Sequence, residues 1–105
     1  MKYGYAVRDN DLAMQLKALN DFGCDDIQFG DDLPLVIDKL KQGDVVAVWR
    51  LDKLANSVAA VERVIEDVHR AGASVELLFE RLNSGSDYKE VLSQLIGVMK
   101  EIEKL

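Results

Sequence analysis

The sequence is poor in cysteine and in long apolar runs. Cys24 is the single cysteine among 105 residues, which excludes an internal disulfide and fits a reducing compartment. No apolar stretch approaches the roughly 20 residues that a membrane-spanning helix needs. The first residues lead directly into a predicted strand, which argues against a signal peptide. We therefore expect a cytoplasmic domain that makes no membrane contact.

Positive charge is also scarce. Thirteen Lys and Arg residues face 19 Asp and Glu residues, which gives a formal net charge of −6. Proteins bind DNA largely by neutralising phosphates with Lys and Arg, and no basic arm or tail is present here. We therefore expect contact with DNA to be weak or indirect.

Metal-ligating patterns are missing as well. His69 is the single histidine and has no cysteine cluster to complete a metal site, so a solvated side chain is expected. The acidic residues of 25–32 lack EF-hand spacing, and no G-x-G-x-x-G loop is present. The sequence thus predicts neither a metal nor a cofactor.

Strands and helices alternate along the chain. Apolar runs rich in β-branched and aromatic residues predict strands, and apolar residues repeating every three or four positions predict helices. Asp9, Asn10 and Asp11 are candidate N-caps of the first helix. The predicted strands are 2–7, 26–29, 45–49 and 74–79, and the predicted helices are 12–22, 34–42, 57–70 and 87–105. This alternation indicates one α/β domain with a mostly parallel sheet covered on both faces.

The stretch 43–57 contains both the predicted central strand and the polar residues that follow it. Its apolar first half is typical of a strand buried on both faces. Arg50, Asp52, Lys53 and Asn56 follow that strand, at the edge where open α/β sheets usually bind ligands. Asp52 and Lys53 are candidates for binding a phosphate or an ion. The alternative, which we favour, is that Asp52 orders the turn after the strand by capping it or by pairing with Lys53 or Arg50.

Five collinear segments resemble the serine recombinases, the resolvase/invertase family. Residues 48–57, V-W-R-L-D-K-L-A-N-S, are similar to the family pattern V-x-[RK]-L-D-R-L-G-R-[ST]. The other matching segments are Y-G-Y-A (3–6), L-A-M-Q-L-K-A-L (12–19), G-C-D (23–25) and G-V-M-K-E-I-E-K (97–104). The resemblance implies a three-layer α/β/α fold with strand order 2-1-3-4, a possible antiparallel edge strand near 81–82 and a long last helix. We expect a single domain over 1–105, without the helix-turn-helix domain that such enzymes normally add.

The activity implied by the resemblance is DNA strand cleavage by a serine hydroxyl, followed by strand rotation and rejoining. The nucleophile belongs in the loop between Ala6 and Gln15, yet this loop is three residues shorter than the family pattern and has no serine. Ser57 is the nearest hydroxyl candidate, and its position predicts a helix N-cap instead. The sequence therefore predicts that no catalytic serine is present.

The arginines that would stabilise the phosphate are depleted too. By the resemblance, family arginines fall on Leu33, Lys53 and Asn56, and lysine lacks the two-pronged geometry of a guanidinium. Arg8 is out of register with the family arginine that precedes the nucleophile. The active-site positions that survive are Gln15, Asp52 and Lys53.

The last helix has more apolar surface than one packing face needs. A row of residues 91, 98 and 105 lies beside a second set with coiled-coil spacing. The resemblance places the family's dimer interface on this helix. The predicted interface residues are Leu92, Leu95, Ile96, Met99 and Ile102. The alternative is a broad stripe buried within one chain.

Three functions fit these features. The first is an inactive resolvase/invertase-like domain that dimerises or binds another recombinase, associated with DNA recombination or a mobile element. The second is a divergent active recombinase, which a protein–DNA adduct would reveal. The third is a small-ligand-binding α/β module, against which stands the absence of a glycine-rich phosphate loop.

Overall fold

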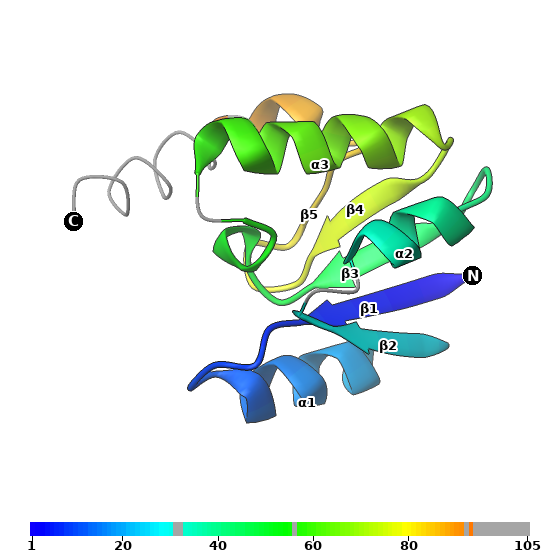
Figure 1. Ribbon diagram of the computed structural model, residues 1–105. Helices are drawn as coiled ribbons and strands as arrows, with labels where there is room; N and C mark the ends of the chain where they lie inside the picture. Colours follow the sequence, from blue (N-terminus) through cyan, green and yellow to red (C-terminus); the bar gives the residue numbers. More distant parts are fainter. Residues whose placement is uncertain (31–32, 56, 92, 94–105) are drawn as a thin grey trace.

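The computed structural model describes residues 1–30, 33–55, 57–91 and 93 (Figure 1). Five strands alternate with helices along most of this chain. The strands are β1 (Lys2–Ala6), β2 (Asp26–Phe29), β3 (Val45–Val48), β4 (Ser74–Leu77) and β5 (Leu82–Asn83). The helices are α1 (Leu12–Phe22), α2 (Leu33–Lys39), the 3₁₀ turn η2 (Leu51–Lys53) and α3 (Val58–Arg70). None of the helices in the described ranges is long and apolar enough to cross a membrane.

The five strands form one sheet in the order β2-β1-β3-β4-β5. All neighbours are parallel except β4 and β5, which pair antiparallel. The predicted order and the antiparallel edge strand are therefore confirmed. The predicted last helix is described only at its start, where residues 88–91 are helical.

Helices cover both faces of the sheet, as Figure 1 shows: α2 and α3 lie on one face and α1 on the other. The alternation of side chains along β3 explains this arrangement. Val46 and Val48 pack in the core beneath α2 and α3, whereas Ala47 packs with Leu19 of α1. All four of these side chains are fully buried. The predicted three-layer architecture is thus confirmed.

The register of β1 and β3 positions the strand ends. Tyr5 pairs with Val48, so the two strands run side by side and end at the same edge. The chain leaves β1 into residues 7–11 and leaves β3 into residues 49–53. Because the strands are parallel, these two segments emerge next to each other although about 40 residues separate them.

Candidate functional site

A pocket of about 360 Å³ opens where β1 and β3 end. We call it the strand-end pocket. Its position is the edge at which the sequence predicts a site. It is lined by Tyr5, Val7, Asp9, Asp52, Lys53, Leu54 and Ala55.

Lys53 is the central charge of this pocket. Its ammonium nitrogen lies 2.7 Å from Asp9 Oδ2 and 3.0 Å from Asp11 Oδ2, and its side chain is only 11% exposed. The hydrogen bond from Lys53 is the largest influence on Asp9 and lowers the pKa of that carboxyl below its usual value. Burial opposes the charged form of Lys53, but the bonds to Asp9 and Asp11 outweigh it and raise the pKa of Lys53. The contact therefore favours the charged forms of Asp9 and Lys53.

Gln15 fixes the loop that carries these carboxylates. Its side chain is fully buried, and its Oε1 accepts from the Val7 amide at 2.8 Å. Its Nε2 donates to Val7 O at 3.0 Å and to Asp9 Oδ1 at 3.0 Å. Asp9 Oδ1 also accepts from the amide of Asp11 at 2.9 Å. Both oxygens of Asp9 are thus occupied by donors from this chain.

Asp52 pairs with Arg50 rather than with Lys53. Asp52 Oδ1 lies 3.7 Å from Arg50 Nε, too far for a hydrogen bond, and neither buried atom has a hydrogen-bond partner among the described residues. The guanidinium of Arg50 lies 4.9 Å from the Phe79 ring centre. Glu80 Oε2 accepts from the Leu51 amide at 3.1 Å. Asp52 and Arg50 thus lie in a charged turn that follows β3.

The other predicted site residues lie elsewhere. Arg8 is exposed, with its guanidinium 4.5 Å from the centre of the Phe29 ring, and does not line the strand-end pocket. Ser57 caps α3, since its Oγ accepts from the Ala60 amide at 3.2 Å. Leu33 is buried at the start of α2. Asn56 lies outside the described residues, as do the predicted interface residues Leu92, Leu95, Ile96, Met99 and Ile102.

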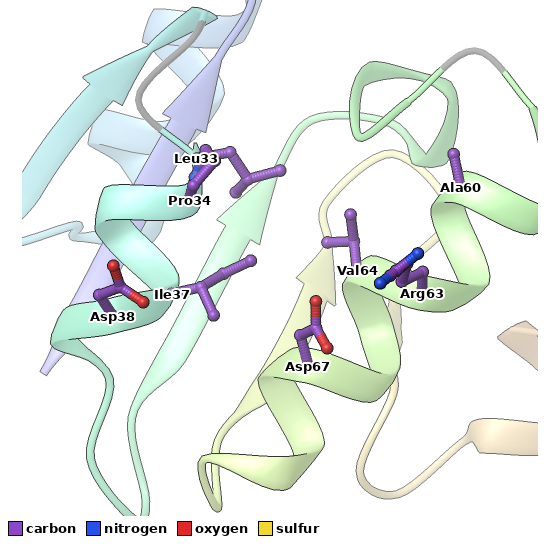
Figure 2. A pocket seen from close by; sticks show the side chains of 8 residues that line it. All are labelled: Leu33, Pro34, Ile37, Asp38, Ala60, Arg63, Val64 and Asp67. Atoms are coloured by element: carbon purple, nitrogen blue, oxygen red, sulfur yellow. The ribbon is translucent and has the colours of Figure 1, made fainter.

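Leu33 lines a second hollow, between α2 and α3. Figure 2 shows Leu33, Pro34 and Ile37 of α2 facing Val64 of α3 across a gap. This hollow has a volume of about 300 Å³ and a mostly apolar lining. Three charged side chains at its edge are Asp38, Arg63 and Asp67. It is separate from the strand-end pocket and shares no residue with it.

Hydroxyl groups are nearly absent from the strand-end pocket. The sequence has no threonine, and its five serines are at 57, 74, 84, 86 and 93. None of the five lines the pocket as the structure describes it. Tyr5 is the one hydroxyl-bearing residue in that lining, and its hydroxyl donates to the carbonyl of Gly30.

The one histidine pairs with a serine at another place. His69 Nε2 lies 2.7 Å from Ser84 Oγ, which also accepts from the Val75 amide at 2.8 Å. Ser84 is 1% exposed and His69 is half-buried, and their contact joins α3 to the residues that follow β5. The prediction of a solvated histidine is therefore only partly right: His69 is half-buried, because β4 and the turn after β5 bring Ser84 to the end of α3.

Sequence reasoning missed the role of Asp9 and Asp11. It treated both as candidate N-caps of α1. Asp11 does stand at the N-cap position, but its side chain makes no capping hydrogen bond. Both carboxylates instead accept hydrogen bonds from Lys53, which lies 44 residues after Asp9 and 42 residues after Asp11. Two acidic residues where the family pattern has its serine loop were the available signal.

The comparisons with known proteins agree on one family. A family model described as Resolvase, N terminal domain matches residues 6–105. Transposon Tn552 DNA-invertase BinR from Staphylococcus aureus is 29% identical over 119 residues, which cover 99% of this chain and 62% of that protein. DNA-invertase hin from Salmonella typhimurium is 26% identical over 106 residues, which cover 91% of this chain and 55% of that protein. The chain therefore spans less than two thirds of either relative.

Solved structures show the same fold. The N-terminal catalytic domain of TP901-1 integrase superposes with a TM-score of 0.69 at 19% identity, covering 99% of this chain and 97% of that one. A resolvase family site-specific recombinase from Streptococcus pneumoniae gives a TM-score of 0.67 at 18% identity, covering 98% and 87%. At such identities the likeness concerns the fold.

Replacing Lys53 by Met is expected to lower the free energy of unfolding by about 1–2 kcal/mol at neutral pH, because it leaves two carboxylates without their cation. The size of this loss of stability depends on pH, because the ion pairs exist only while their groups are charged. The Asp9 contribution holds above its usual pKa of 3.8 and disappears as pH falls through its lowered folded value. The Lys53 contribution holds below 10.5 and disappears as pH rises through its raised folded value.

Urea unfolding of wild type and Lys53→Met across pH 2.5–11.5 measures this difference. Lys17→Met is the matched control, because Lys17 pairs with Asp21 at 3.0 Å on the open surface, where Lys17 is 79% exposed. That variant is expected to lose less than about 0.5 kcal/mol. A Lys53→Met loss no larger than the Lys17→Met loss would contradict the geometry described here.

Proposed function

Because the chain belongs to the resolvase N-terminal-domain family of serine recombinases, we propose that it is a recombination-associated domain that keeps the family fold without the cleavage chemistry. The strand-end pocket carries the proposal. Cleaving a phosphodiester through a covalent intermediate needs a nucleophile, together with cations placed on the non-bridging oxygens. The described lining offers neither a serine nor a lysine without an acidic partner.

The rate that a missing nucleophile costs indicates whether cleavage would be slow or negligible. Removing a covalent nucleophile costs on the order of 10⁶ in kcat where this has been measured. Here Lys53 is in addition held by two carboxylates at 2.7 and 3.0 Å. Counting Lys53 as +1 and Asp9 and Asp11 as −1 each, the cluster has a net charge of −1, which repels a phosphate. Cleavage at a useful rate is therefore not expected from this pocket.

Association with a second protein is the function left to such a domain. Val91 is fully buried and packs in the core beneath α3. One apolar row of the last segment thus begins inside its own domain. The residues with coiled-coil spacing, 92, 95, 99 and 102, form a different row, which supports a partner-facing role. The partner is a second copy of this chain or another recombinase of the family.

Wild-type protein incubated with supercoiled plasmid is expected to give no nicked product and no protein–DNA adduct. The reason is that the described lining of the pocket contains no serine, and that its one hydroxyl, on Tyr5, donates to the carbonyl of Gly30. Gel analysis under denaturing conditions, with an active serine recombinase and its own site as positive control, checks this. A protein linked covalently to a DNA 5′ end would overturn the proposal that this domain does not cleave DNA.

At tens of micromolar, sedimentation velocity of the wild-type protein is expected to show a dimer. Leu95→Glu is expected to raise the dissociation constant of this dimer at least tenfold, so that the variant sediments mainly as monomer. A charge in an apolar seam must be desolvated on association, which explains the direction. Met14→Glu is the matched control, because Met14 is 57% exposed on α1. Wild-type protein that sediments only as monomer would remove the self-association part of the proposal.

A further inference from the structure

The strand-end pocket contains an ammonium group whose acidic partners come from the chain itself. Among the described residues, Lys53 is the one cationic side chain in the lining. Its ammonium nitrogen has carboxylate oxygens at 2.7 and 3.0 Å, which are the distances of charge-assisted hydrogen bonds. The surroundings are built rather than incidental, since fully buried Gln15 holds Val7 and Asp9 in place.

We propose that the segment 7–11 is an internal occupant of this site, with Asp9 and Asp11 in the place of an external phosphate-type oxyanion. Carboxylate and phosphate oxygens compete for the same ammonium donor. An incoming oxyanion must displace both carboxylates from a lysine that is only 11% exposed. The site is therefore closed while the Asp9 and Asp11 carboxylates bond Lys53, and it opens when both are replaced by neutral side chains. This contact keeps the pocket of the intact chain free of phosphate.

A pocket occupied by its own chain differs from a pocket that has only lost its nucleophile. A pocket that merely lacks a nucleophile still binds a phosphate through its lysine. A pocket that is occupied from within does not bind one, and it regains binding when the occupant is neutralised. The two proposals therefore make different predictions, one about covalent adducts and the other about anion affinity.

The amide variants test the contact while keeping the loop. In Asp9→Asn, the remaining side-chain oxygen can still accept from Gln15 Nε2 and from the Asp11 amide, the two donors that now bond Asp9 Oδ1. The amide nitrogen then takes the place of Oδ2 and offers Lys53 no acceptor. Asp11→Asn removes the second negative charge, so that in the double variant Lys53 keeps its charge and faces neither of its two carboxylates.

Inorganic pyrophosphate is the probe, and Trp49 fluorescence is the readout. Trp49 is the single tryptophan, and Lys53 Nζ lies 5.8 Å from the centre of its ring. Asp9→Asn/Asp11→Asn is expected to bind pyrophosphate at least tenfold more tightly than wild type, and adding Lys53→Met is expected to abolish that gain. The matched control is Asp21→Asn/Asp38→Asn, which makes the same charge change at exposed positions and is expected to bind as wild type does.

A gain of similar size in the control variant, or wild-type affinity equal to that of the double variant, would overturn the inference. A measurement on the wild-type protein guards against a double variant that fails to fold. Lys53 is expected to react with acetic anhydride at least tenfold more slowly than Lys17, which is 79% exposed and pairs with Asp21. Equal acetylation rates, measured by mass spectrometry of peptides, would likewise overturn it.

Discussion

The ion pairs between Lys53 and the carboxylates of Asp9 and Asp11 are the contacts on which the strand-end pocket depends. They join the segment after β1 to the turn after β3, at distances of 2.7 and 3.0 Å. Gln15 completes the connection by fixing the backbone of Val7 from within α1. Because Lys53 is largely buried, removing its acidic partners leaves a poorly solvated charge, which costs more than breaking an exposed ion pair. They also decide the charge that the pocket presents to a ligand.

Fold and chemistry are separable in this domain because different residues carry them. The sheet order follows from side chains packed on its two faces, such as Val46 and Val48 on one side and Leu19 with Ala47 on the other. The residues that line the pocket lie beyond the strand ends, where loop residues change without disturbing the core. A family fold can therefore persist while its site acquires a different chemistry.

The sequence predicted the architecture well, since apolar runs and helical periodicity reflect burial directly. Strand order and the antiparallel edge strand came from the resemblance, and the structure has both. The site was predicted less completely. Pairing of Lys53 with Asp9 and Asp11 spans 44 and 42 positions, and local sequence reads those acids as helix caps. The contact of His69 with Ser84 is hidden for the same reason: it exists only after α3 and β4 have packed.

The most direct test of the account is the titration of the Asp9 carboxyl carbon by NMR, in wild type and in Lys53→Met. If Lys53 binds this carboxylate, the pKa of Asp9 lies below its usual value of 3.8 in wild type and rises in the variant. A wild-type Asp9 that titrates at its usual value, unchanged by Lys53→Met, would contradict the claim that the lysine of this pocket is held from within.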